Sequence, residues 1–297
     1  MTGKAVVGVD VGGTKIMTGV ISPEGKILGE PFKIPTGQHD PNEVIVRRIH
    51  QAIDKVLEDA DITLDGIQGI GLGVPGPLDM KNGVILDPLQ LPTMRNFPLR
   101  QVIQDRYPVP VYMNNDANCL LLGESYFGAG AGLKIVVGFT LGTGLGAAII
   151  IDGKLFLGAT ETAGEVWFAP YKDEFIEAYV SGRGITRTYK KLTGKELSPP
   201  EIAALGHRGE IMAVKTWEEF GTDLAYCIAW CVNILDPDIV ILGGSIANAM
   251  DLFSTTMEKY LRQHLCPVPA SKTRVTRAAL GDHAGFIGAA CLVLEKL

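Results

Sequence analysis

Apolar strands around a glycine-containing turn occur twice along the chain. Residues 6–12 and residues 136–142 share Val-Val-Gly followed by a later glycine, at a constant offset of 130 positions. After each of them comes a turn of small residues and then a second apolar strand, at residues 16–21 and 146–151. The matching order of these elements predicts an internal duplication.

Helical periodicity fills the segments between the predicted strands. In residues 40–43 an aspartate stands as a candidate N-cap, a proline follows at the first helical position, and an acid stands at the third. This order predicts a helix that runs to about Leu57. A long helix is predicted from Glu210 to Leu235, and the last helix begins at about Ala284. Strands that alternate with helices predict the α/β class, here with two similar domains.

The charge and the glycine content narrow the class of protein. Lysine plus arginine number 27 and aspartate plus glutamate number 33, so the net charge of −6 argues against a nucleic-acid partner. Glycine accounts for 36 of the 297 residues, which is about 12% against a usual ~7%. Such an excess in an ordered protein predicts tight turns and close approach of the backbone to a ligand.

The cysteine and hydropathy patterns bear on the cellular compartment in which the protein is found. The five cysteines form no Cys-x-x-Cys pair, which is typical of a reducing compartment. Asp10 interrupts the first apolar stretch, so we expect no signal peptide. Residues 135–151 form an uncharged run, but its four glycines and two threonines favour a strand, a turn and a strand over a membrane helix. We therefore expect a cytoplasmic protein with no membrane partner.

The two glycine turns are candidate phosphate-binding sites. The first turn contains Asp10, Gly12, Gly13, Thr14 and Lys15, and the second contains Gly142, Thr143 and Gly144. Glycine lets backbone N–H groups approach an anion closely, and a threonine adds a hydroxyl donor. Asp10 would repel a bare phosphate, so its presence favours a magnesium ion held through water. The alternative is a pair of glycine hairpin turns without a ligand.

Asp116 lies between an apolar strand at residues 109–113 and a helical stretch at residues 120–127. A carboxylate at a helix N-terminus stays ionised because the helix dipole favours the anion. Asp116 can therefore be an N-cap, or it can be the base that accepts a proton from a substrate hydroxyl in phosphoryl transfer. The spacing of the residues leaves both interpretations open.

Six short motifs occur in the order in which the ROK family has them, a family whose name stands for repressor, open reading frame, kinase. They are Asp10-Val11-Gly12-Gly13-Thr14-Lys15, Gly73-Val74-Pro75-Gly76, Asn115-Asp116-Ala117-Asn118, Leu141-Gly142-Thr143-Gly144-Leu145-Gly146, Ala163-Gly164-Glu165 and Leu242-Gly243-Gly244. The chain resembles this family from Val6 to about Ala290. The resemblance implies an actin/hexokinase-like (ribonuclease H-like) α/β fold, duplicated into two domains with a central cleft. The expected smaller N-terminal domain comprises residues 1–116 plus 284–297, and the larger C-terminal domain comprises residues 117–283.

The resemblance also implies a role for individual residues. The ATP phosphates would be bound by the two turns, and the adenosine would be approached by Gly243 and Gly244. The sugar would be bound by Gly76, Asn115, Asp116, Glu165 and Glu177, with Asp116 as the catalytic base. Asp10 would organise the magnesium ion through water.

One segment departs from the family pattern. The family has a histidine where this chain has Phe168, and then a cysteine-rich zinc knuckle, whereas residues 166–176 contain no cysteine and no histidine. A structural zinc ion needs about four nitrogen or sulfur ligands, so we predict no structural zinc. We expect Trp167, Phe168 and Tyr171 to pack as an apolar clamp in its place.

The sequence therefore predicts an ATP-dependent, magnesium-requiring hexose kinase that acts on glucose or a related hexose or N-acetylhexosamine. Its two domains would close over the sugar and exclude water, and the family resemblance implies a homodimer or homotetramer. A repressor is a weaker alternative, because the phosphate loop starts at residue 10 and leaves no room for a preceding helix-turn-helix. A sugar sensor or regulator without kinase activity is the other alternative, and the presence of Asp10 and Asp116 argues against it.

Overall fold

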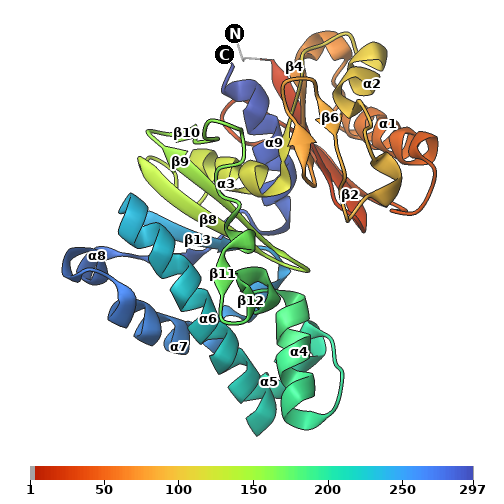
Figure 1. Ribbon diagram of the computed structural model, residues 1–297. Helices are drawn as coiled ribbons and strands as arrows, with labels where there is room; N and C mark the ends of the chain where they lie inside the picture. Colours follow the sequence, from red (N-terminus) through yellow and green to blue (C-terminus); the bar gives the residue numbers. More distant parts are fainter. Residues whose placement is uncertain (1–3, 297) are drawn as a thin grey trace. The chain divides into compact units, whose positions relative to one another are not determined.

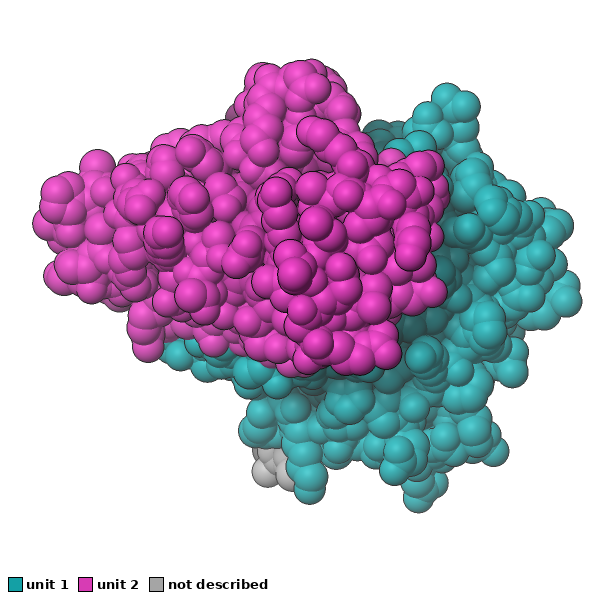
Figure 2. Space-filling model, turned by 90° about the horizontal axis from the view of Figure 1, so that it is seen from below, with its two compact units in different colours: residues 1–132, 279–297 teal, residues 133–278 magenta. Residues whose placement is uncertain are grey.

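The chain divides into two compact units, which Figure 2 colours separately. The computed structural model describes residues 4–296. Unit 1 comprises the described residues up to Gly132 together with those from Ala279 onward, and unit 2 comprises Leu133–Ala278. The division thus falls at residues 132 and 278 rather than at the expected 116 and 284, and the N-terminal unit is not the smaller one. The reason is that the helix beginning at Asp116 packs against the last helix of the chain.

Unit 1 is built on a five-stranded sheet with the order β3-β2-β1-β4-β7. The strand β1 pairs antiparallel with β2 and parallel with β4, and β4 pairs parallel with β7. The strands are β1 (Ala5–Val11), β2 (Lys15–Ile21), β3 (Ile27–Pro35), β4 (Ile67–Val74) and β7 (Val111–Asn115), with a small hairpin of β5 (Leu78–Asp79) and β6 (Val84–Ile85). The helices are α1 (Asn42–Asp59), α2 (Leu99–Arg106), α3 (Asp116–Phe127) and α9 (Ala284–Leu294).

Helices cover both faces of this sheet (Figure 1). On one face the apolar side of α1 packs on β1, β2 and β3, where alternate apolar strand residues form a continuous core with it. On the other face α9 lies directly against β1 and β4. A Cβ atom on Gly8 would lie 1.8 Å from the carbonyl oxygen of Phe286, and one on Gly71 would lie 1.7 Å from that of Ala289. Only glycine allows this close approach between a helix and a sheet.

Unit 2 repeats the same arrangement at the predicted offset. Its five-stranded sheet has the order β10-β9-β8-β13-β14, in which β8 pairs antiparallel with β9 and parallel with β13. The strands are β8 (Ile135–Leu141), β9 (Leu145–Ile151), β10 (Lys154–Leu155), β13 (Ile239–Gly243) and β14 (Val275–Arg277). The bounds of β8 and β9 are those of β1 and β2 shifted by 130 residues, so the predicted duplication of the strand–turn–strand unit is confirmed.

The helices of unit 2 pack around the long helix α6 (Ile211–Leu235). Around it lie α4 (Gly182–Thr193), α5 (Pro199–His207) and α7 (Met250–His264), and unit 2 also contains α8 (Pro267–Lys272) and a hairpin of β11 (Pro170–Tyr171) and β12 (Glu174–Phe175). The rings of Trp217, Phe220 and Phe253 pack together where α6 meets α7. None of the helices within residues 4–296 is both long and apolar enough to cross a membrane.

The helix boundaries agree with the sequence predictions to within a few residues; α3 begins at Asp116, four residues before the predicted helical stretch at residues 120–127. Helix α6 begins after Glu210, whose side chain accepts hydrogen bonds from the first turn, and it ends at Leu235 as predicted. Helix α1 begins at Asn42, with Pro41 rather than Asp40 as its N-cap. The carboxylate of Asp40 instead pairs with Arg48, a residue of the same helix, at 2.6 Å, and this ion pair replaces the predicted cap.

A buried carboxylate ties the returning C-terminal segment to the rest of unit 1. Glu124 on α3 is fully buried, and its oxygens accept backbone N–H hydrogen bonds from Ala129 at 2.8 Å, Ala279 at 3.0 Å and Leu280 at 2.8 Å. A buried carboxylate persists only when such donors replace its lost hydration. Glu124 therefore fixes the backbone just before α9 against the end of α3.

We expect Glu124→Ala to lower the free energy of unfolding by about 1–3 kcal/mol, because it removes a buried carboxylate together with the three part-buried hydrogen bonds that it accepts. Chemical or thermal denaturation of the purified variant measures this loss. The matched control is Glu219→Ala, which removes an exposed glutamate from α6 and is expected to change stability by less than ~0.5 kcal/mol. Equal unfolding midpoints for the two variants would contradict the anchoring role.

Candidate functional site

The first glycine turn is closed by its own backbone and held by a neighbouring loop. The N–H of Gly12 donates to the carbonyl of Lys15 at 2.9 Å. The hydroxyl of Thr36, just beyond β3, donates to the carbonyl of Gly12 at 2.6 Å, and the N–H of Thr36 donates to the carbonyl of Thr14 at 3.1 Å. These bonds fix the turn between β1 and β2 in one conformation.

Parallel strand pairing brings three of the predicted site segments to one edge of the unit 1 sheet. Asp10 is opposite Gly73 in the β1–β4 register, and Gly73 is opposite Asn114 in the β4–β7 register. The carboxyl ends of parallel strands meet at the same edge. Asp10, the Gly73–Gly76 motif and the Asn115–Asp116 pair therefore leave the sheet side by side.

Asp10 occupies a tight, poorly hydrated position at the end of β1. A Cβ atom on Gly285 of α9 would lie 2.4 Å from a carboxylate oxygen of Asp10. Burial, reinforced by the negative charge of Asp116, raises the pKa of Asp10 to about 7, while the charge of Lys15 opposes the shift. A nearby cation would therefore stabilise the ionised form of the Asp10 carboxyl group.

This donor chemistry fits a magnesium ion. Mg²⁺ prefers hard oxygen ligands, keeps several waters, and in phosphate sites binds to one or two carboxylates together with phosphate oxygens. Within residues 4–296 no three histidine, cysteine, aspartate or glutamate side chains are grouped closely enough to hold a metal ion by themselves. A cation at Asp10 would therefore depend on water and phosphate oxygens for its other ligands.

The contacts at the N-terminus of α3 show which residue caps this helix, and so bear on whether Asp116 is an N-cap or a base. The N-cap is Asn115, whose side-chain oxygen accepts the N–H of Ala117 at 2.9 Å. Asp116 is the first helical residue, and its side chain is exposed. The amide oxygen of Asn114 accepts from the N–H of Asn115 at 2.7 Å and from the side chain of Asn118 at 2.9 Å. The carboxylate of Asp116 accepts the same N–H of Ala117 at 2.9 Å, so Asp116 adds to the cap that Asn115 forms and stands at the positive end of the helix dipole.

Gly76 lies beside this helix terminus. A Cβ atom on Gly76 would lie 3.2 Å from the side-chain nitrogen of Asn115. The predicted sugar-binding residues of unit 1, which are Gly76, Asn115 and Asp116, thus come together in the structure. At the level of the sequence, only the family resemblance indicated that these three residues would lie together.

The second glycine turn, between β8 and β9, is held from two sides in unit 2. The N–H of Gly142 donates to the carbonyl of Gly144 at 3.0 Å, and the carbonyl of Gly142 accepts the N–H of Gly182 at 2.8 Å. On the other side, the carboxylate of Glu177 accepts the N–H of Leu145 at 3.0 Å. The N-terminus of α4 and the short 3₁₀ helix at Ile176–Ala178 therefore fix this turn together.

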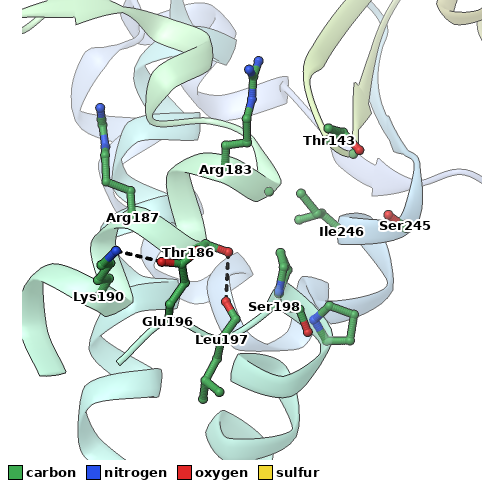
Figure 3. A pocket seen from close by; sticks show the side chains of 14 residues that line it. Thr143, Arg183, Thr186, Arg187, Lys190, Glu196, Leu197, Ser198, Ser245 and Ile246 are labelled. Carbon is green, nitrogen blue, oxygen red and sulfur yellow. Dashed lines mark hydrogen bonds and ion pairs between the residues drawn. The ribbon is translucent and has the colours of Figure 1, made fainter. Parts of the chain in front are cut away.

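A pocket of about 870 Å³ opens beside the second turn (Figure 3). Its walls come from the second turn, from α4, from the start of α5 and from the segment after β13. The lining residues are Gly142, Thr143, Gly182, Arg183, Thr186, Arg187, Lys190, Glu196, Leu197, Ser198, Pro199, Pro200, Ser245 and Ile246. The predicted Gly142 and Thr143 belong to this wall. The predicted Gly243 and Gly244 do not, although the two residues that follow them do.

The basic residues of this pocket were not predicted from the sequence. Arg183, Arg187 and Lys190 project from one side of α4, and each pairs with an acid, at 2.6 Å with Glu177, 2.5 Å with Glu174 and 2.7 Å with Glu196. Their spacing of four and three residues places them on one helical face. That spacing was the available signal, but a charged face is usually only a solvated one, so the sequence did not single them out.

Glu165 lies on an exposed segment of unit 2. Its carboxylate accepts a hydrogen bond from the indole N–H of Trp167. The ring of Trp167 packs edge-on against Phe168 at 5.1 Å, and Phe168 stacks on Phe175 at 4.1 Å. The expected aromatic clamp is therefore present with a different third member, because Phe175 of β12 takes the place predicted for Tyr171.

Tyr171 instead anchors the β11–β12 hairpin to α6. Its hydroxyl donates to the nearly buried carboxylate of Asp223 at 2.8 Å, and Lys172 pairs with the same carboxylate at 2.6 Å. Burial, followed by the hydrogen bond to Asp223, raises the pKa of the Tyr171 hydroxyl. A charged anchor and an aromatic stack thus order the segment in which the family has its zinc knuckle.

Known proteins match this chain over nearly its whole length. The model of the ROK family matches residues 6–296. The chain is similar to a glucokinase from Halalkalibacterium halodurans, 30% identical over 321 residues that cover 100% of this chain and 97% of that protein. It is also similar to an N-acetyl-D-glucosamine kinase from Photobacterium profundum, 33% identical over 97% of this chain and 99% of that one.

A solved structure gives the same result for the fold. The crystal structure of a ROK family glucokinase from Streptomyces griseus in complex with glucose and AMPPNP matches with a TM-score of 0.83 and 30% identity, covering 98% of this chain and 99% of that chain. The expected actin/hexokinase-like fold is therefore confirmed. With the order of its motifs, the repeated sheets and the full-length family match in agreement, this chain belongs to the ROK family.

Proposed function

We propose that this protein is an ATP-dependent hexose kinase that transfers the γ-phosphate of ATP to a hydroxyl group of glucose or of a related hexose or N-acetylhexosamine. The observation that carries the proposal is the placement of Asp116, exposed at the N-terminus of α3 beside Asn115 and Gly76. Its relatives named glucokinase and N-acetyl-D-glucosamine kinase, at 30% and 33% identity, support this class of substrate.

Asp116 is the proposed catalytic base. The sugar hydroxyl attacks the γ-phosphorus, the bond from the γ-phosphorus to the bridging oxygen of ADP breaks, and the hydroxyl proton passes to the carboxylate of Asp116. The carboxylate of Asp116 stands at the positive end of the α3 dipole. Because Asn115 caps the helix, Asp116 can take up the proton without loss of the cap.

The nucleotide is proposed to bind to the pocket of unit 2. A volume of about 870 Å³ suits a nucleoside with its phosphates. Thr143 offers a hydroxyl, and the turn offers backbone N–H groups besides that of Gly142, which donates to Gly144; these are the donors that phosphates prefer. The Asp10–Lys15 turn of unit 1 is proposed to bind phosphate by the same means, with a magnesium ion held through water at Asp10; when bound, the ion would neutralise developing charge on the phosphates.

Glu165 is the proposed sugar ligand of unit 2, because a carboxylate accepts hydrogen bonds from paired sugar hydroxyls. Its hydrogen bond to Trp167 fixes the direction of the carboxylate. We also propose a homodimer or homotetramer in the cytoplasm, as the family resemblance and the cysteine pattern imply. A sugar sensor without kinase activity would not require both Asp10 and Asp116.

The function is tested by a coupled ADP-release assay with a panel of sugars, each supplied with ATP and magnesium. We expect glucose, mannose, N-acetylglucosamine or N-acetylmannosamine to support turnover above the ATPase background. The same sugar, at about 100 times its Kd, should stabilise the protein by about 2.7 kcal/mol and raise its melting temperature. Melting shifts without any turnover would favour the sensor, and neither effect with any hexose would contradict the proposal.

Asp116→Asn should lower kcat by at least ~10²-fold, because the variant loses the group that accepts the proton. KM for the sugar and the melting temperature should stay near those of the wild type, since Asn115 still caps α3. Steady-state kinetics and thermal unfolding measure the two effects. Asp65→Asn, which changes an exposed acid away from the site, is the control, and near-normal turnover in Asp116→Asn would refute the assignment of the base.

Phe168→Ala should raise KM for the sugar more than KM for ATP. The substitution removes the stack on Phe175 and loosens the segment that presents Glu165, while the second glycine turn keeps its own supports. The control is Phe156→Ala, because Phe156 is similarly exposed, at 45% against 56%, and lies after β10. An equal rise in both KM values, or none in either, would contradict a role for the stack on the sugar side.

A further inference from the structure

The loop that follows β3 contacts every residue of the first glycine turn. The hydroxyl of Thr36 donates to the carbonyl of Gly12, and the N–H of Thr36 donates to the carbonyl of Thr14. A Cβ atom on Gly13, between them, would lie 3.1 Å from the side-chain oxygen of Gln38. Two of these contacts come from Thr36, which is fully buried.

The hydroxyl of Thr36 determines the direction in which the N–H of Gly13 points. In a planar trans peptide the carbonyl of one residue and the N–H of the next point in opposite directions. Because the carbonyl of Gly12 is bound to Thr36, the N–H of Gly13 is directed away from Thr36. In the part of the chain that the structure describes, this N–H has no hydrogen-bond partner. It is therefore available to an anion at the turn.

The equivalent carbonyl of unit 2 is held by a different donor. At the offset of 130 residues Gly142 corresponds to Gly12, and its carbonyl accepts the N–H of Gly182 at 2.8 Å. Both turns therefore have the carbonyl of their first glycine fixed, by a backbone donor in unit 2 and by the side chain of Thr36 in unit 1. The recurrence with two unrelated donors indicates that the turn itself requires this contact.

Arg48 of α1 holds the loop from the helix side. Its Nη1 atom donates to the carbonyl of Thr36 at 2.6 Å and to the carboxylate of Asp40 at 2.6 Å. Gly37 has a φ of 67°, and a Cβ atom on it would lie 2.2 Å from both the guanidinium nitrogen and the carboxylate oxygen. Glycine at this position therefore lets the loop close around the guanidinium. An ion pair on α1 is thus connected through Thr36 to the first glycine turn.

We propose that Thr36 is a positioning residue for phosphate binding, whose hydroxyl sets the orientation of the peptide between Gly12 and Gly13 while Arg48 keeps Thr36 in place. This inference rests on the proposed function, because it concerns a turn that is proposed to bind the phosphates of ATP. It goes beyond that function by assigning a role to residues outside both glycine turns. The ligand of the positioned N–H is a phosphate oxygen of a nucleoside triphosphate.

The test compares Thr36→Val with Thr36→Ser in the full chain. Valine keeps the shape of threonine but has no hydroxyl, whereas serine keeps the donor. We expect Thr36→Val to weaken the binding of AMPPNP with magnesium, measured by calorimetry, and to lower kcat/KM for ATP, each about tenfold, as the loss of one oriented hydrogen bond would. Thr36→Ser should stay within about twofold of the wild type, because the donor is retained. KM for the sugar should stay near that of the wild type in both variants.

The matched control is Thr18→Val, the same substitution in the same unit. Thr18 is also fully buried, on β2, but within residues 4–296 its hydroxyl has no hydrogen-bond partner. This variant should bind AMPPNP as the wild type does. Equal losses in Thr18→Val and Thr36→Val would reveal a general effect of altered packing and would overturn the proposal.

Arg48→Met provides a second test that does not depend on the folding of Thr36→Val. Arg48 is only partly buried, and its removal leaves both hydrogen bonds from Thr36 to the turn in place. AMPPNP affinity should therefore fall by a smaller factor of about three. Arg47→Met removes the neighbouring exposed arginine and should leave the affinity unchanged.

Three results would overturn the inference. They are nucleotide binding and kinetics that are unchanged in both Thr36→Val and Arg48→Met, a rise in KM for the sugar with unchanged AMPPNP binding, and a wild type that does not bind AMPPNP. By contrast, AMPPNP binding that depends on the Thr36 hydroxyl, in a protein that phosphorylates no sugar, would support this inference while contradicting the proposed kinase function.

Discussion

Direct contact between helix α9 and the paired strands β1 and β4 is the constraint on which unit 1 depends. Gly8 and Gly71 carry no side chain, so the helix backbone reaches the sheet, and Glu124 anchors the segment that leads into the helix. The same helix places Gly285 against the carboxylate of Asp10. One packing interaction thus closes the core and also creates the poorly hydrated environment in which the pKa of Asp10 rises.

The two glycine turns share a backbone design but differ in the acids around them. In unit 1 the acid is Asp10, at the end of the strand that precedes the turn, where its carboxyl group is suited to a cation. In unit 2 the position equivalent to Asp10 is Thr140, and the nearby acid, Glu177, approaches the turn from a different segment and is already paired with Arg183. The two units therefore share the strands and the turn, while the charged groups next to each turn come from different segments.

The segment between Glu165 and Glu177 shows how a loop is ordered without metal ligands of its own. Stacked aromatic rings hold one side of it, and the carboxylate of Asp223 anchors the other side through Tyr171 and Lys172. The first device uses contacts between partly exposed aromatic rings, and the second uses hydrogen bonds and an ion pair, in place of coordinate bonds. The orientation of Glu165 depends on this packing through its bond to Trp167.

The sequence by itself determined the two strand–turn–strand units, their repetition and the helices α1, α6 and α9, because apolar alternation, helical periodicity and glycine placement act over short distances. It also determined the candidate base Asp116, through its motif. Only the tertiary structure decided that Asn115 is the cap, that Phe175 replaces Tyr171 in the aromatic stack, and that Glu177 and Arg183 join at the second turn. These outcomes depend on which side chains meet after folding, and a spacing along the chain does not encode which of several acids or rings lies within contact distance.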